Sequence, residues 1–422
     1  MRTKEYIENL INKGKHFCIH PWVHLHVTGF GRMAPCCRLV DSPNSMGYGD
    51  LNTNSIHELW QGEAIRNFRL KMLNDEMDEL CKNCYEIDKV SSSFRKFYNF
   101  KFHKYADWVA DTDDTGYAPR AKPISWDIRF SNLCNLRCRT CGSGSSSSWY
   151  KDEKALGILN SNVSHEVMNS ICNSNAFLAD LEQYYPYVET IYFAGGEPLL
   201  FKENLVILEK LASIQRYDVE LTFNTNITQF NKSNRFLELW KKYKRLGILA
   251  SLDGSGKRCE YLRKGLEWNN VLNNLDYLKK ECPHAEVINI FTVSAFNILH
   301  LPDFHKEMIA KRYFRADKIH LNILHESNHY NIRILPEELK KQAAQKIKEH
   351  IVWLKRQNLL TRLFNHYQHN FGQWYGCIDY MNSENWTHLI PEFIEYTNKL
   401  DALRNEKCLD IFPELEPIFH IN

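Results

Sequence analysis

Six short runs of strand-forming residues, separated by helix-like segments, constrain the fold of this 422-residue chain more than any other feature. Strands that alternate with helices pair in parallel through right-handed crossovers, which gives an α/β fold. Six such units predict a partial (β/α)6 barrel, and a doubly wound sheet is the alternative that this pattern leaves open. The runs cover residues 124–130, 190–194, 219–224, 247–252, 287–293 and 318–324.

The segments on either side of this alternation have a different character. Residues 1–109 hold five cysteines and suggest an irregular module with one clear helix over Ser55–Leu73. Residues 110–123 are polar and turn-rich, which predicts a linker. Residues 331–422 are mainly helical in pattern. We therefore expect four regions: an N-terminal module, a linker, a barrel over residues 124–330 and a helical C-terminal region.

Polar residues alternate along the third predicted strand. Glu220, Thr222, Asn224 and Asn226 fall on one face of it. A complete eight-stranded barrel fills its interior with branched apolar side chains. A polar inner face therefore suggests an open barrel that holds a polar ligand, and a solvated sheet face is the simpler alternative.

Charge and hydropathy argue against two classes of partner. The chain has 53 basic and 51 acidic residues, so it lacks the basic excess that nucleic acids or membrane surfaces favour. No run approaches about 18 consecutive apolar residues, and the N-terminus lacks a signal-peptide core. We expect a cytoplasmic protein without a nucleic-acid or membrane partner. Its 13 cysteines are unlikely to form disulfides there, so closely spaced cysteines are expected to bind metal or a cluster.

Three cysteines follow the first predicted strand within one loop. They are Cys134, Cys138 and Cys141, with the spacing C-x3-C-x2-C. Barrels of this class place their active sites at the carboxyl ends of strands. Thiolates suit iron–sulfur clusters or zinc, but a structural zinc site needs a fourth ligand, which this loop does not supply. Three thiolates on a four-iron cluster leave one iron open.

The second predicted strand ends in the segment YFAGGEP, residues 192–198. Gly195 and Gly196 let the backbone approach a ligand closely, and Glu197 offers an acceptor for an ammonium group. Alone, GGEP fits an ordinary turn equally well. One strand after the cysteine loop, it indicates a second part of the same site.

The cysteine loop and the GGEP segment together resemble the radical S-adenosylmethionine (SAM) superfamily. The resemblance covers the whole middle region. It implies that the open iron chelates the amino and carboxylate groups of SAM, whose reductive cleavage gives methionine and a 5′-deoxyadenosyl radical. That radical would remove a hydrogen atom from a substrate, while the protein positions the cofactor. An external reductant such as flavodoxin or ferredoxin would supply the electron.

The same resemblance assigns further cofactor contacts to the ends of later strands. Each of these residues could instead be a loop cap or a surface group. They are Asn224 and Asn226 after the third strand, Ser251 and Asp253 in the segment SLDG, Arg263 in YLRKG, and Ser294 and Asn297 after the fifth strand.

The N-terminal region carries a second array of cysteines. The array combines Cys18, Gly31-x4-Cys36, the segment GDLNTNSIHELW and Cys81-x2-Cys84. It resembles the twitch or SPASM auxiliary-cluster modules of radical enzymes, here placed before the barrel. The resemblance implies a second 4Fe–4S cluster that transfers electrons, because four thiolates leave no open iron. A four-cysteine zinc site is the alternative.

Cys37 and several histidines complicate the ligation of this module. Adjacent residues of an extended chain point to opposite sides, so only one of Cys36 and Cys37 should face the cluster, and the spacing from Gly31 favours Cys36. His24 and His26 alternate on a strand-like run, which favours a structural role over a metal site. Two further histidines, His16 and His20, flank Cys18.

These patterns predict a radical SAM enzyme that modifies a peptide or a small, sugar-like molecule. Cys377, in the aromatic segment QWYGCIDY, is a candidate hydrogen-atom donor, and a buried structural cysteine is the alternative. A non-catalytic or electron-transfer iron–sulfur protein is the second hypothesis, which the intact GGEP disfavours. A zinc-stabilised nucleic-acid-binding module is the third, and the near-neutral charge disfavours it.

Overall fold

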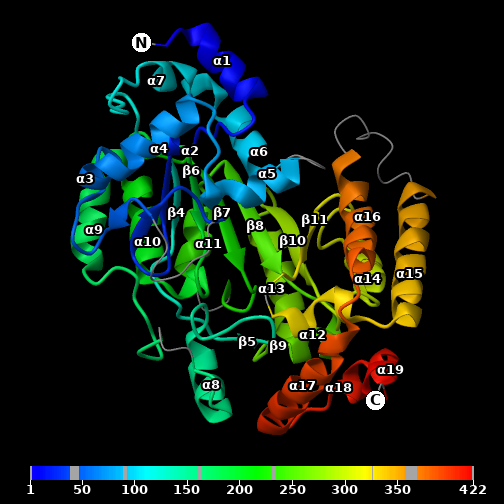
Figure 1. The fold of residues 1–422 in the computed structure, drawn as a ribbon. Helices are drawn as coiled ribbons and strands as arrows, with labels where there is room; N and C mark the ends of the chain where they lie inside the picture. Colours follow the sequence, from blue (N-terminus) through cyan, green and yellow to red (C-terminus); the bar gives the residue numbers. More distant parts are fainter. Residues whose placement is uncertain are drawn as a thin grey trace. The chain divides into compact units, whose positions relative to one another are not determined.

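The chain forms two compact units in the computed structural model (Figure 1). Unit 1 comprises Met1–Leu133, Val167–Phe223 and Lys242–Arg245, and unit 2 comprises Cys134–Glu166, Asn224–Lys241 and Leu246–Asn422. The predicted division into four regions stays a prediction. The structure describes residues 2–38, 47–88, 93–159, 163–230, 234–325, 327–356 and 368–420.

Unit 1 is built on a sheet with the strand order β7-β6-β4-β1-β2-β3. Strands β4, β6 and β7 pair in parallel, as the strand–helix alternation predicts. The N-terminal module adds β1 in parallel to β4, and β2 and β3 follow in antiparallel order. The strands are β1 (His24–Val27), β2 (Arg32–Ala34), β3 (Gly49–Asp50), β4 (Ser125–Ile128), β6 (Thr190–Phe193) and β7 (Glu220–Thr225).

The helix predicted over Ser55–Leu73 in unit 1 is divided into two helices. Ser55 and Glu58 form a reciprocal capping box at the start of α3, but the helix ends at Trp60, and Gly62 is the N-cap of the next helix, α4. Glycine is unfavourable inside a helix, which explains the break. The helices of this unit are α1 (Lys4–Lys13), α2 (His20–Val23), α3 (Ile56–Trp60), α4 (Glu63–Leu73), α5 (Lys82–Asp88), α6 (Phe94–Lys101), α7 (Ala106–Ala110), α9 (Ser174–Leu181) and α10 (Lys202–Ser213).

Unit 2 contains the later strands of the alternation. Strands β8, β10 and β11 pair in parallel, and a short antiparallel pair joins β5 to β9. Each of the six runs predicted from the sequence is thus a strand, and the α/β class is confirmed. The strands are β5 (Arg137–Cys138), β8 (Arg245–Ser251), β9 (Arg263–Lys264), β10 (Glu286–Val293) and β11 (Ile319–Ile323).

The C-terminal region of unit 2 is helical, as predicted, and α15 and α16 lie side by side in it (Figure 1). In the part of the chain that the structure describes, no helix combines the length and apolar character needed to cross a membrane. The helices of unit 2 are α8 (Tyr150–Leu156), α11 (Asn234–Trp240), α12 (Gly256–Leu262), α13 (Trp268–Glu281), α14 (Leu301–Ala310), α15 (Glu337–Arg356), α16 (Gln368–Ser383), α17 (Ile390–Arg404), α18 (Cys408–Ile411) and α19 (Glu416–Phe419).

Candidate functional site

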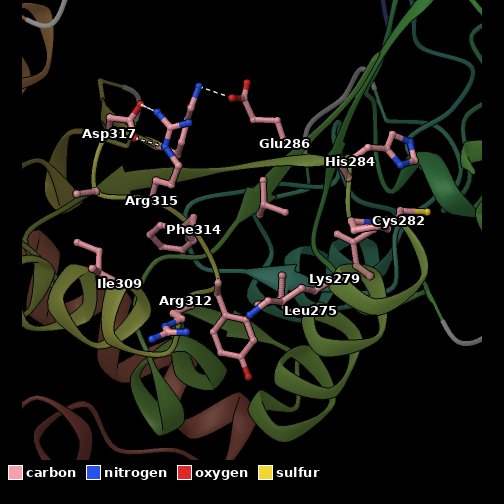
Figure 2. A pocket seen from close by; sticks show the side chains of 17 residues that line it. Leu275, Lys279, Cys282, His284, Glu286, Ile309, Arg312, Phe314, Arg315 and Asp317 are labelled. Atoms are coloured by element: carbon pink, nitrogen blue, oxygen red, sulfur yellow. Dashed lines mark hydrogen bonds and ion pairs between the residues drawn. The ribbon is translucent and has the colours of Figure 1, made fainter. Parts of the chain in front are cut away.

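A cavity of about 630 Å³ in unit 2 is lined by none of the predicted site residues (Figure 2). Its lining residues come from the ends of α13 and α14 and from the segments that lead into β10 and β11. An ion pair between Arg315 and Asp317 lies on its wall. The cavity therefore opens at the amino ends of these strands, whereas barrel active sites form at the carboxyl ends.

The three cysteines of the C-x3-C-x2-C loop lie together. Cys138 belongs to β5, and the backbone N–H of Cys141 donates to the carbonyl oxygen of Cys138 at 3.0 Å. Burial raises the pKa of the Cys141 thiol, and the nearby thiols of Cys138 and Cys134 raise it further. Such mutual proximity of three sulfurs is what a shared iron–sulfur cluster requires.

Arg263 and Asp253 border this loop as a pair. The guanidinium of Arg263 donates to Cys138 Sγ at 3.7 Å and forms an ion pair with Asp253 Oδ2 at 2.8 Å. Asp253 Oδ1 in turn accepts from the backbone N–H of Thr292 at 2.8 Å. A guanidinium beside a sulfur stabilises its thiolate form. The two residues contact each other, a pairing that their separate positions in the sequence do not predict.

The remaining predicted cofactor contacts lie at strand ends and are hydrogen-bonded. Ser251 donates to Asn224 Oδ1 at 2.9 Å, and Asn226 donates to the side-chain oxygen of Asn135 at 3.0 Å. Asn135 directly follows Cys134, so Asn226 is tied to the cysteine loop. Ser294 is fully buried, and its backbone N–H donates to Asn297.

In unit 1, the GGEP segment packs on the residues just ahead of Cys134. Gly196 N donates to the carbonyl oxygen of Ser131 at 3.2 Å, and Glu197 N donates to that of Leu133 at 2.8 Å. A Cβ atom on Gly196 would lie 2.2 Å from the Leu133 oxygen, so only glycine fits. Glu197 is 1% exposed and accepts a hydrogen bond from Leu199 N.

The cysteines of the N-terminal module also approach one another. Burial raises the pKa of the Cys36 thiol, and so do three nearby thiols, those of Cys37, Cys18 and Cys81. Burial likewise raises the pKa of Cys18 to about 12, with Cys84 contributing in the same direction. The four cysteines of the predicted auxiliary site are thus gathered in one place.

Cys37 faces a different neighbour from Cys36. Burial raises the pKa of the Cys37 thiol to about 12, and Asp127, which shares a hydrogen bond with it, raises it too. Asp127 lies on β4. The two adjacent cysteines therefore contact different groups, which supports Cys36 as the ligand of the auxiliary site.

Arg139 belongs to the cysteine loop and forms ion pairs with the C-terminal region. The sequence analysis did not identify this residue. Its side chain is fully buried and pairs with Asp401 and with Glu406 Oε2, the latter at 3.0 Å. The guanidinium also stacks on Tyr261, 3.6 Å from the ring centroid. The signal was available in the sequence, because a charged residue between two predicted ligand cysteines needs a partner if the loop is buried.

Cys377 lies in α16 and is 1% exposed. Burial alone raises the pKa of its thiol to about 12. The thiol is therefore neutral near pH 7, which suits a hydrogen-atom donor and a core residue equally. Its role as a donor stays a prediction.

Two family models match the chain. Residues 128–309 match the radical SAM superfamily, and residues 18–85 match SPASM, an iron–sulfur cluster-binding domain. The chain contains a radical SAM domain. The SPASM match precedes it in the sequence. The fold is accordingly a partial α/β barrel of the radical SAM type, followed by a helical C-terminal region.

The two matched domains confirm the predicted cofactors. A radical SAM domain binds SAM and a 4Fe–4S cluster, and a SPASM domain binds an auxiliary iron–sulfur cluster. The side chains fit these groups. Gathered thiols are the soft ligands that iron–sulfur clusters need, and the GGEP glycines leave backbone without covering side chains beside Asn132 and Leu133.

Solved structures show only a distant likeness. The structure of anSMEcpe with bound AdoMet is 19% identical, with a TM-score of 0.40, over 57% of this chain and 62% of that chain. The same protein with AdoMet and the Cp18Cys peptide gives the same values. TYW1 with a lysine–pyruvate adduct is 15% identical, with a TM-score of 0.27, over 54% and 70% of the two chains. The chain thus matches less than two thirds of anSMEcpe, and no curated protein matches it.

Proposed function

We propose that this chain is an enzyme that cleaves SAM reductively and uses the resulting 5′-deoxyadenosyl radical to remove a hydrogen atom from a substrate. One observation carries the proposal. Three cysteine thiols gather in the loop that follows β4, and the GGEP segment is hydrogen-bonded to the residues directly ahead of that loop. When bound, SAM and the site cluster supply the radical chemistry.

The residues of the chain hold and orient these groups. Cys134, Cys138 and Cys141 bind the site cluster and leave one iron open for SAM. Glu197 is buried, so its carboxylate is a strong acceptor for the ammonium group of SAM. Arg263 donates to Cys138 Sγ and offsets the negative charge that accumulates on the thiolates.

The N-terminal module binds the auxiliary 4Fe–4S cluster through Cys18, Cys36, Cys81 and Cys84. Four thiolates complete the coordination of such a cluster, so it does not bind substrate through iron. Its role is electron transfer, either from a substrate radical or towards the barrel. An external reductant such as flavodoxin or ferredoxin provides the first electron, and the substrate is a peptide or a small, sugar-like molecule.

The decisive experiment measures 5′-deoxyadenosine by mass spectrometry after anaerobic reduction of the holoprotein with SAM. The wild type should form it. The variant with Cys134, Cys138 and Cys141 changed to Ala should not, and it should lose about four irons per chain. Cys282→Ala is the control, because it removes a cysteine of unit 2 that lies outside the predicted site. Cleavage at the wild-type rate by the triple variant refutes the proposal.

The second candidate function is electron transfer without catalysis. It predicts both clusters but no 5′-deoxyadenosine from the wild type, so the same experiment separates it from the first. A screen of peptides and amino sugars under the same reducing conditions, scored by 5′-deoxyadenosine formed above the substrate-free rate, then separates the two substrate classes.

A further inference from the structure

A group of buried donor atoms lies where the N-terminal module joins the barrel sheet in unit 1. Strand β1 pairs with β4 so that His24 stands opposite Ser125 and His26 opposite Asp127. Residues two apart on a strand point to the same face, so both histidines share a face with Asp127. One ligand atom from each of these three residues lies within 4.8 Å of the others.

The donor set has a defined chemistry. Two imidazoles and one carboxylate are the ligands of mononuclear non-haem Fe²⁺ sites, and zinc accepts the same set. His24 Nδ1 lies 3.0 Å from Ser125 Oγ, which leaves the other ring nitrogen available. A metal-binding histidine ordinarily uses its second nitrogen in this way, because that hydrogen bond fixes the tautomer and the ring orientation.

The contacts inside the group are incomplete without a cation. His26 Nδ1 and Asp127 Oδ2 are 3.1 Å apart, yet His26 Nδ1 has no properly directed hydrogen bond among the described residues. The ring of His20 stacks on that of His24 at 4.4 Å. His20 is 6% exposed, and its Nε2 likewise has no hydrogen-bond partner in the described chain. Buried polar atoms are ordinarily satisfied, so these atoms point to a missing ligand.

Cys37 approaches Asp127 but lies outside the group of three donor residues. Its thiol shares a hydrogen bond with Asp127, whereas Cys36 lies among the other cysteines of the module. Arg129 approaches Asp127 Oδ1 at 3.5 Å, which leaves Oδ2 facing His26.

We propose that His24, His26 and Asp127 bind one divalent first-row cation, Zn²⁺ or Fe²⁺. This site is separate from both iron–sulfur clusters. The alternative is a buried His–Asp pair that holds β1 against β4 without a metal. The proposal does not depend on SAM cleavage, and none of its tests uses that activity.

The test begins with metal analysis of anaerobically purified holoprotein that carries both clusters. A zinc site gives about one zinc per chain beside about eight irons, and an iron site gives about nine irons without zinc. The protein is then treated with a mild chelator, oxidised to the diamagnetic state of its clusters, and given Co²⁺. We expect about one Co²⁺ per chain, with a high-spin Co²⁺ resonance that added Zn²⁺ removes.

Variants then assign the ligands. His26→Ala and Asp127→Asn should each weaken Co²⁺ binding by more than about a hundredfold, beyond the roughly 10–100-fold effect of outer partners. Cys37→Ser should bind Co²⁺ with wild-type affinity, because Cys37 lies outside the group of three donor residues. His350→Ala removes a fully buried histidine of unit 2 and should leave binding unchanged.

Two results overturn the proposal. One is a wild-type protein that retains no cation beyond its cluster iron and binds no Co²⁺. The other is Asp127→Asn with wild-type Co²⁺ affinity. If His26→Ala or Asp127→Asn loses its clusters and thus its fold, the metal stoichiometry of the wild type decides the question.

Discussion

The buried cation Arg139 should determine how firmly the cysteine loop holds its cluster. Arg139 lies between Cys138 and Cys141, and its side chain has no exposure to solvent. Asp401 and Glu406, its two carboxylate partners, are also largely buried. Arg139→Met keeps an unbranched apolar stem but removes the charge. Asp401 then loses its cation, whereas Glu406 keeps its ion pair with Lys264.

The expected cost follows from that geometry. Removing one member of a buried ion pair typically costs about 3–5 kcal/mol, because the remaining charge is desolvated and uncompensated. The lost stacking on Tyr261 adds to this. If this loss of free energy applies to local opening of the loop, the fraction of molecules with an open loop rises by about two to three orders of magnitude. Each difference of about 1.4 kcal/mol changes that equilibrium constant tenfold.

Iron release to a chelator measures this opening. Iron from the cluster of this loop should be released in a phase that the Cys134/Cys138/Cys141 variant lacks. We expect Arg139→Met to accelerate that phase by roughly a hundredfold or more. Lys399→Met is the control, because Lys399 pairs with Glu395 on the exposed face of α17 and its loss should cost under about 1 kcal/mol.

A further variant tests the cause of the effect. Replacing Arg139, Asp401 and Glu406 together with apolar residues should restore slow release, because a buried ionic group can often be exchanged for apolar packing at little cost. Arg139→Met with wild-type iron release would show that this ionic group does not hold the loop.

Two further predictions concern ligands of the cofactors. Glu197→Ala should lower the affinity for SAM by about tenfold to a hundredfold, the equivalent of about 1.5–3 kcal/mol for a lost charge-assisted hydrogen bond, with the cluster iron unchanged. Anaerobic calorimetry measures it, and an unchanged affinity would remove Glu197 from the site. Cys37→Ala should leave the cluster iron near about eight per chain, whereas Cys36→Ala should lower it, because only Cys36 lies with the other thiols of the module. The reverse pattern would exchange the two roles.

Local patterns in the sequence were sufficient to predict the strands and to identify the cofactor motifs. All six predicted strands are present, because alternation of strand and helix is a short-range property of the chain. The cysteine spacings and the GGEP glycines were likewise visible, because a cluster or a close backbone approach requires specific residues within one loop. The break at Gly62 was the exception, since a single residue decided it.

Contacts between distant parts of the chain were decided only by the tertiary structure. Arg139 pairs with a carboxylate 262 positions away, and the Arg263–Asp253 pair forms beside a cysteine more than a hundred positions earlier in the chain. His24 appeared structural in the sequence because its strand partner lies 101 positions later. Register between strands depends on burial and on the whole sheet, which no local pattern contains. The sequence therefore determined which chemical groups the chain carries, and the pairing of β1 with β4 decided that two histidines and Asp127 share one buried face.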